Sequence, residues 1–291
     1  MRPLHRTRAF FRAYEYFPHR LLNRSAALVT GATRPRRAVD LAVAAWARLE
    51  DIDLSDFEAR RFESLDDFFL RRLRPGARPV GPGWVSPADG VLVSRGTLRR
   101  DQELCIKGQR LSLERVVNAD AFELDLAPYD GGQHCVVFLT PRGYHRVHAP
   151  SAGEILDVRW IPGRYFPQNE DALEHVPRIY ERNERVVLRC RAEAGFEYLV
   201  IMVGASLIGG IHLRGFERRD FVGPRLTPVG RAVQKGEEIG HFAFGSTVVL
   251  LLPESARAGP VPAPQDVRMG QTLFESSTSL PCEQGAQEGV P

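Results

Sequence analysis

The run Thr247-Val248-Val249-Leu250-Leu251-Leu252 is an unbroken series of apolar and β-branched residues that directly follows Gly245-Ser246. Its composition and length are typical of a core strand. Similar runs occupy residues 91–93, 135–139, 186–188 and 199–203, and Gly and Pro separate them repeatedly. The sequence from about residue 84 to residue 275 therefore predicts a β-rich domain with mainly antiparallel sheets.

The sequence before this β-rich stretch has helical spacing instead. A first helical face, interrupted at Pro18, carries Phe10, Tyr14, Phe17 and Leu21. A second helical pattern covers residues 36–50. A third helix is expected to begin at Ser64, with Asp67 as its capping partner, and to end before Pro75-Gly76. That helix should bury Leu65, Phe68, Phe69 and Leu73.

The positive charge of the chain is concentrated near its N-terminus. The 291 residues carry a net charge of +3, yet residues 1–50 hold ten Arg against three acidic residues, so the remainder is net negative. Helices rich in Arg and aromatic residues can lie in the headgroup layer of an anionic membrane. The alternative is two ordinary helices that pack on the domain with solvated Arg side chains, and this segment alone fits both.

Composition argues against several classes of protein. Four cysteines without a C-x-x-C pair do not fit a zinc ribbon, a redox motif or a secreted disulfide framework, and they favour a reducing, intracellular setting. The longest uncharged run, residues 198–213, is too short to span a bilayer, and no signal-peptide pattern is present. No block of mixed basic and aromatic residues suggests nucleic-acid binding.

Three short motifs carry residue types that are used in catalysis. One motif, Pro87-Ala88-Asp89-Gly90, places an acid in a turn. Another, Tyr144-His145-Arg146-Val147-His148, places two imidazoles three residues apart, and Gly245-Ser246 offers a hydroxyl beside an unhindered carbonyl. Each alone also fits a structural role: a β-turn, two buried histidines, or a turn that enters a strand. Nothing nearby completes a metal site, so none is predicted.

The combination of motifs is more specific than any one of them. Three segments, in one order and widely separated, resemble the phosphatidylserine decarboxylase family: Ser-Pro-Ala-Asp-Gly at 86–90, Thr-Pro-Arg-Gly-Tyr-His-Arg-Val-His-Ala-Pro at 140–150, and Lys-Gly-Glu-Glu-Ile-Gly-His-Phe-Ala-Phe-Gly-Ser-Thr at 235–247. The resemblance covers nearly the whole chain, including Phe-Phe-Leu-Arg-Arg-Leu-Arg-Pro at 68–75. Phe244 departs from the aliphatic residue usual there, which leaves the reacting atoms unchanged.

This resemblance implies that the chain cuts itself between Gly245 and Ser246 and converts Ser246 into a pyruvoyl group. A serine hydroxyl needs a base, and the matching base is His148, with Asp89 holding its tautomer and stabilising the imidazolium. The ketone of the pyruvoyl group then accepts the electron pair freed when carbon dioxide leaves phosphatidylserine, which yields phosphatidylethanolamine. His145 is expected to protonate the resulting carbanion.

The expected fold is α+β, with N-terminal, membrane-associating helices in residues 1–62, a β-rich catalytic domain in residues 63–275 and a disordered tail in residues 276–291. Cleavage would leave a long β chain, 1–245, and a short α chain, 246–291, paired as a heterodimer or assembled into a larger homo-oligomer. The expected partners are phosphatidylserine and an anionic membrane surface, with the protein peripheral on the cytoplasmic face of the cell membrane.

Two other functions fit parts of the pattern. A serine hydrolase would use Asp89, His148 and Ser246 in an intact chain, although the G-x-S-x-G elbow is absent around Ser246. A non-catalytic module is the second, because the Gly-rich turn Lys235-Gly236-Glu237-Glu238 resembles the hairpins of lipoyl-type carrier domains. That alternative leaves Asp89, His145 and His148 without a role.

Overall fold

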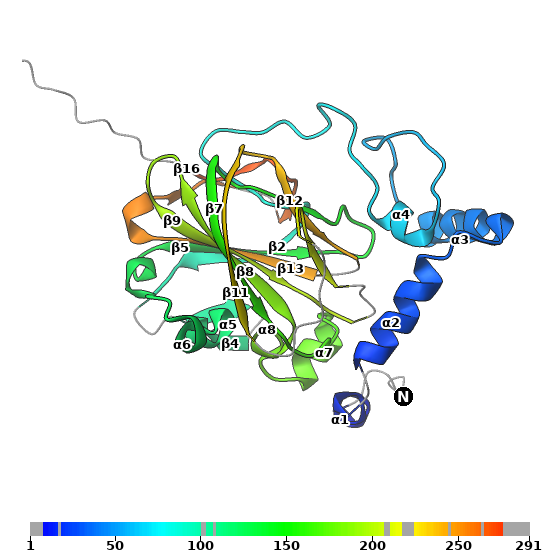
Figure 1. Ribbon diagram of the computed structural model, residues 1–291, viewed down its shortest axis with the longest axis horizontal. Helices are drawn as coiled ribbons and strands as arrows, with labels where there is room; N and C mark the ends of the chain where they lie inside the picture. The colour runs from blue at the N-terminus through cyan, green and yellow to red at the C-terminus, as the bar shows by residue number, and fades with distance from the viewer. Residues whose placement is uncertain are drawn as a thin grey trace, which may run out of the picture.

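The computed structural model describes residues 8–16, 19–99, 103–106, 109–206, 210–216, 224–243, 246–262 and 265–275. Three helices come first: α1 (Arg8–Glu15), α2 (His19–Thr30) and α3 (Arg36–Leu49). Figure 1 shows α2 and α3 to one side of a β-rich body, so the α+β fold with N-terminal helices is confirmed. No helix of the described residues is long and apolar enough to cross a membrane. Pro18 and the tail 276–291 fall outside the described residues.

Helix α4 (Leu65–Phe69) is shorter than the sequence pattern predicts. Ser64 caps it as expected, because its Oγ accepts the Asp67 N–H at 3.0 Å. The helix ends at Phe69, so the predicted continuation to Leu73 is wrong. Backbone pairing with the preceding loop competes with helix continuation, since Leu73 forms a β-bridge with Phe57 beside it.

Eight antiparallel strands form the central sheet in the order β11, β7, β8, β9, β13, β5, β2 and β15. In that order their bounds are Arg225–Val233, Gly153–Ile161, Arg185–Ala192, Glu197–Val203, Ser246–Leu252, Gln133–Leu139, Gly90–Thr97 and Asp266–Val267. The five predicted apolar runs form β2, β5, β8, β9 and β13. All seven residues of β13 are buried between β9 and β5, which confirms a core strand at residues 247–252.

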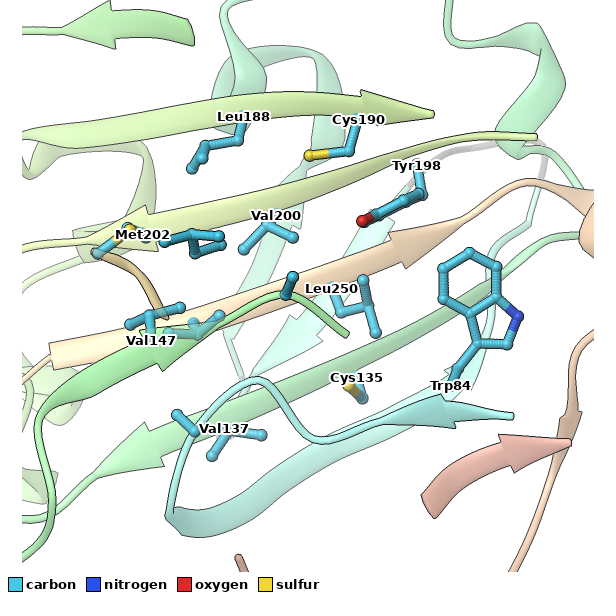
Figure 2. Close-up of a cluster of buried hydrophobic side chains, with 14 of the residues drawn as sticks. Trp84, Cys135, Val137, Val147, Leu188, Cys190, Tyr198, Val200, Met202 and Leu250 are labelled. Carbon is cyan, nitrogen blue, oxygen red and sulfur yellow. The ribbon is translucent and has the colours of Figure 1, made fainter. Parts of the chain in front are cut away.

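Alternate residues of β13 face two different hydrophobic clusters, because successive side chains of a strand point to opposite faces. Val248 and Leu250 belong to the cluster drawn in Figure 2, and Val249 and Leu251 belong to the other. Two small sheets cover the first cluster. One consists of β10 (Ile211–Leu213), β12 (Glu238–Phe242) and β6 (Arg146–His148), and the other of β1 (Trp84–Val85), β16 (Thr272–Glu275) and β14 (Gly259–Pro260).

The second cluster lies under short elements at the opposite face of the central sheet. These are β3 (Glu103–Ile106), β4 (Gln109–Ser112), α5 (Leu113–Val117), α6 (Ala119–Phe122), α7 (Glu170–His175) and α8 (Ile179–Arg182). Figure 1 shows α5, α6, α8 and β4 gathered at one end of the body. The inner strands β5, β8, β9 and β13 are therefore buried on both faces, which explains why their sequences contain continuous apolar runs.

Candidate active site

The three sequence motifs meet around β6 and the loop that precedes it. The backbone N–H of His148 donates to Pro87 O at 2.8 Å, which holds the first motif against the second. The N–H of Phe242, in the third motif, donates to His145 O at 3.0 Å. Ser246 begins β13 beside the end of β5, which directly precedes the second motif. Backbone hydrogen bonds thus join segments that are far apart in the sequence.

The side chain of His148 is buried, and both its ring nitrogens have partners. Nδ1 lies 2.8 Å from Gly236 O, and a carbonyl only accepts, so Nδ1 carries the proton. Nε2 therefore accepts the hydroxyl of Tyr144 at 2.9 Å. Burial lowers the pKa of His148, while the Gly236 hydrogen bond and the carboxylates of Glu238 and Asp89 oppose that shift. The ring is a neutral imidazole whose basic atom is Nε2.

The carboxylate of Asp89 is held by Arg78 and by one backbone amide. Arg78 donates to it from Nε at 3.1 Å and from Nη2 at 2.6 Å, and the N–H of Met269 adds a bond of 2.7 Å. No hydrogen bond joins Asp89 to His148 in the described part of the chain. A Cβ at Gly90 would lie 2.4 Å from Phe138 O, so glycine is needed there for close approach of β2 to β5.

Ser246 is the first residue of β13 and is completely buried. Its Oγ has no hydrogen-bond partner among the described residues. A buried hydroxyl without a partner costs roughly 1–3 kcal/mol, and such groups in native structures are often functional. The neighbouring Thr247 shows the ordinary arrangement, because its Oγ1 donates to Gln168 Oε1 at 2.6 Å. Gly245 lies outside the described residues.

His145 is completely buried, and it forms fewer hydrogen bonds among the described residues than His148 does. Its Nδ1 donates to Gly143 O at 3.1 Å, whereas its Nε2 has no partner among the described residues. The ring of Phe69 covers it, with centroids 3.9 Å apart. Burial lowers the pKa of His145 to about 3, the Gly143 hydrogen bond opposes this, and the charge of Arg71 adds to it. The imidazole is therefore neutral, and the lone pair of its Nε2 is not engaged by any described residue.

A cavity of about 290 Å³ reaches one part of this site, and His145, His148 and Ser246 are not among the residues that line it. Asp89 and Tyr144 lie on its wall together with Arg71, Arg78 and the 51–57 loop. Charged groups of both signs line it, which suits a small zwitterionic headgroup better than an apolar ligand. Among the described residues, no three His, Cys, Asp or Glu side chains are grouped as metal ligands.

Several residues of the site were not singled out from the sequence. Tyr144 occurred in a quoted motif without an assigned role, and Gly236 occurred in one only as a turn residue. Arg78 binds Asp89, 11 positions further on, and Arg71 binds the backbone of residues 142–143, more than 70 positions further on. The burial of a guanidinium group cannot be predicted from a single sequence, because the local sequence around a buried Arg does not differ from that around an exposed one.

Comparisons with known proteins agree on one family. A family model described as phosphatidylserine decarboxylase matches residues 65–275. Phosphatidylserine decarboxylase proenzyme of Pseudomonas putida strain GB-1 is 34% identical over 286 residues, which cover 93% of this chain and 98% of that protein. The proenzyme of Pseudomonas aeruginosa strain PAO1 is 35% identical over 285 residues, which cover 91% of this chain and 96% of that protein.

Proposed function

The chain belongs to the phosphatidylserine decarboxylase family, and from that premise we propose that it matures by cutting itself between Gly245 and Ser246. It is an enzyme that decarboxylates phosphatidylserine. In our proposal the cut converts Ser246 into a pyruvoyl group, and the mature enzyme produces phosphatidylethanolamine and carbon dioxide. The observation that supports this most is the buried Ser246 hydroxyl, which has no hydrogen-bond partner among the described residues, at the start of a core strand.

Ser246 has the chemistry that self-cleavage requires, because it supplies both the nucleophile and the carbon atoms of the pyruvoyl group. Its Oγ is not committed to any hydrogen bond in the described chain, so it is available as a nucleophile. Attack on the Gly245 carbonyl carbon forms an ester and breaks the peptide C–N bond. Loss of the Ser246 α-proton then expels the Gly245 carboxylate and leaves dehydroalanine, and addition of water releases ammonia and leaves a ketone. Each step uses only the chain and water.

His148 is the base that we assign to this maturation. Gly236 fixes its tautomer so that Nε2 is the proton acceptor, and burial keeps the ring neutral. Asp89 supports the imidazolium through its negative charge, which raises the pKa of His148, without a direct hydrogen bond. Because Tyr144 occupies Nε2, Ser246 must displace that hydroxyl before proton transfer.

His145 is the residue that we assign to turnover. The pyruvoyl ketone, once formed, supplies an electron sink for the pair freed as carbon dioxide leaves. The serine headgroup arrives as an ammonium, and Nε2 of His145, which no described residue engages, can take one of its protons. His145 then returns that proton to the α-carbon, and the released amine regains a proton from solvent. His145 therefore acts as the acid only after it has acted as a base.

We further assign the N-terminal helices to an anionic membrane surface on the cytoplasmic side. Large apolar side chains stand exposed between residues 16 and 49: Tyr16, Leu28, Val29, Leu41 and Leu49. The same region holds the excess of Arg, so apolar burial and charge attraction would add together. The cleaved fragments would stay paired as a heterodimer, because β13 is bonded to β5 and β9 along its length.

Replacement of the nucleophile tests this function. We expect Ser246→Ala to give an intact chain and no carbon dioxide from phosphatidylserine, because both the nucleophile and the precursor of the ketone are lost. Ser246→Cys should cleave slowly or partially, since a thiol still attacks the Gly245 carbonyl. Gel electrophoresis with a carbon dioxide assay measures both. Two fragments from Ser246→Ala would reject the cleavage site, and hydrolase activity in an uncut wild-type chain would favour a serine hydrolase.

A further inference from the structure

The end of α4 approaches the catalytic region from the helical side of the molecule. Phe69, the last residue of α4, is 2% exposed and covers the ring of His145, with centroids 3.9 Å apart and planes inclined by 37°. The two residues are 76 positions apart in the sequence, so the contact depends on the packing of α4 against the loop before β6. Phe69 therefore excludes water from one face of the imidazole.

Arg71, two residues further on, donates a hydrogen bond to the same carbonyl oxygen that accepts a hydrogen bond from His145. Its guanidinium is completely buried and donates from Nη2 to Arg142 O and to Gly143 O, both at 2.7 Å. The same Gly143 O accepts the Nδ1–H of His145 at 3.1 Å. No carboxylate among the described residues pairs with Arg71, so its task is to bind these backbone oxygens. Arg71 also rests on the ring of Phe57 at 4.5 Å.

The segment that carries Phe69 and Arg71 is bound to the N-terminal helices. Arg36 of α3 donates to Phe62 O at 2.6 Å and to Glu63 O at 3.2 Å, directly before α4. Helices α2 and α3 also contact α4 directly. The segment that contacts His145 is thus fixed by helices, whereas His145 itself belongs to the loop before β6.

We propose that Phe69 and Arg71 are positioning residues for decarboxylation, which hold His145 as a neutral imidazole with its proton on Nδ1 and with Nε2 as its proton-accepting atom. This inference rests on the role in turnover that we have proposed for His145. Phe69 excludes water and Arg71 fixes Gly143 O, so the two act on different properties of the ring. Phe69 mainly keeps the ring neutral, and Arg71 mainly keeps the tautomer.

Histidine NMR of the full-length chain tests the geometry independently of catalysis. In the uncleaved Ser246→Ala background, His145 is assigned by its loss in His145→Gln, and we expect an Nδ1-protonated ring that does not titrate between roughly pH 5 and 8. Phe69→Leu should make it titrate, with its pKa moving from about 3 toward its ordinary value. Arg71, the charged side chain that acts on this ring, remains in that variant. Arg71→Met should instead mix the two tautomers.

Controls separate positioning from stability. Phe274→Leu makes the same change at a completely buried Phe of β16 and should leave the His145 signals unchanged. Arg71→Lys keeps the charge but not the planar donor group, so it should restore the tautomer only in part. Phe69→Met fills a similar volume without a ring and replaces Phe69→Leu if that variant does not fold.

Turnover of the cleaved enzyme completes the test. We expect Phe69→Leu and Arg71→Met in the Ser246 chain to cleave fully, while kcat falls at least about tenfold. KM should change little in Phe69→Leu, because Phe69 does not line the cavity and its loss impairs the proton transfer, not substrate binding. Unchanged His145 signals in the folded variants would overturn the inference whatever the activity. Changed signals with an unimpaired kcat would overturn it too, and would also remove His145 from the proposed turnover.

Discussion

The two histidines of the site share a tautomer but differ at the other nitrogen. Each donates from Nδ1 to a carbonyl, His148 to Gly236 and His145 to Gly143. The Nε2 of His148 accepts the hydroxyl of Tyr144, whereas the Nε2 of His145 has no partner in the described chain. We therefore expect the two residues to act at different stages, one in maturation and one in turnover.

Alanine substitutions separate those stages. We expect His148→Ala, and also Asp89→Asn, to stop self-cleavage, because the hydroxyl loses its base or the charge that supports it. His145→Ala should still cleave, while turnover falls by the roughly 10²–10⁴-fold typical of a lost acid–base group. Fragment analysis and a carbon dioxide assay distinguish the outcomes. Equal loss of cleavage in His145→Ala and His148→Ala would contradict the division.

Tyr144 offers a sharper test of how the base is reached. Its hydroxyl occupies the atom of His148 that must accept the Ser246 proton, so it competes with Ser246. We expect Tyr144→Phe to cleave at least as fast as the wild-type chain, measured as the time course of fragment formation after synthesis. Slower cleavage would show that the hydroxyl relays the proton, and the competition would be rejected.

At this scale the sequence shows which residue types take part but not which atoms they bind. The motifs around Asp89, His145, His148 and Ser246 were readable, and the structure joins those segments by backbone bonds. The expected contact of Asp89 with His148 is absent from the described structure, because Arg78 occupies the carboxylate and Gly236 occupies Nδ1. Such pairings depend on tertiary placement, and whether Asp89, His148 and Ser246 act as a triad stays a prediction.

Among the elements, β13 connects the fold to the reaction. It carries Ser246 at its first position and is hydrogen-bonded on both sides, so the strand fixes the nucleophile and also holds the fragment that cleavage would release. Its apolar run was recognisable because both of its faces are buried. The end of α4 could not be predicted from the sequence. The apolar spacing is helical as far as Leu73, but Leu73 pairs with Phe57 in a β-bridge instead.

Leu250 measures how much β13 contributes to stability. The side chain is completely buried in the cluster of Figure 2, so Leu250→Ala should lower the free energy of unfolding by roughly 2–5 kcal/mol. Denaturant unfolding in the uncleaved Ser246→Ala background gives the value for a single chain. Leu226→Ala, at a partly exposed position of β11, is the control and should change it by less than about 0.5 kcal/mol. Equal losses would contradict the burial argument.

For the whole molecule, charge and exposed apolar surface coincide on the N-terminal helices. The region of net positive charge is also where Leu28 and Leu41 stand exposed, on α2 and α3. Figure 1 shows these helices away from the small elements α5, α6 and β4. The cavity is lined by Arg71, two residues after α4, and α4 contacts α2 and α3, so the cavity lies next to the segment that packs against the helices that we assign to lipid.

Vesicle sedimentation tests that assignment. We expect binding to phosphatidylglycerol vesicles to weaken as salt rises, because the Debye length falls from about 10 Å at 0.1 M to about 3 Å at 1 M. Leu28→Asp with Leu41→Asp should weaken it further at every salt concentration. Leu226→Asp, which adds one such charge on β11, should have little effect and is compared with Leu28→Asp alone. Equal binding to neutral vesicles at all salt concentrations would reject the electrostatic contribution.

The mass of the smaller fragment tests the central claim most directly. The wild-type chain, purified and denatured, should yield a fragment of residues 246–291 that is lighter than the corresponding serine-terminated peptide by the elements of ammonia. That loss is expected because a ketone at position 246 replaces the amine and hydroxyl of serine. A single intact chain, or a fragment that begins with an unmodified serine, would contradict self-cleavage to a pyruvoyl group.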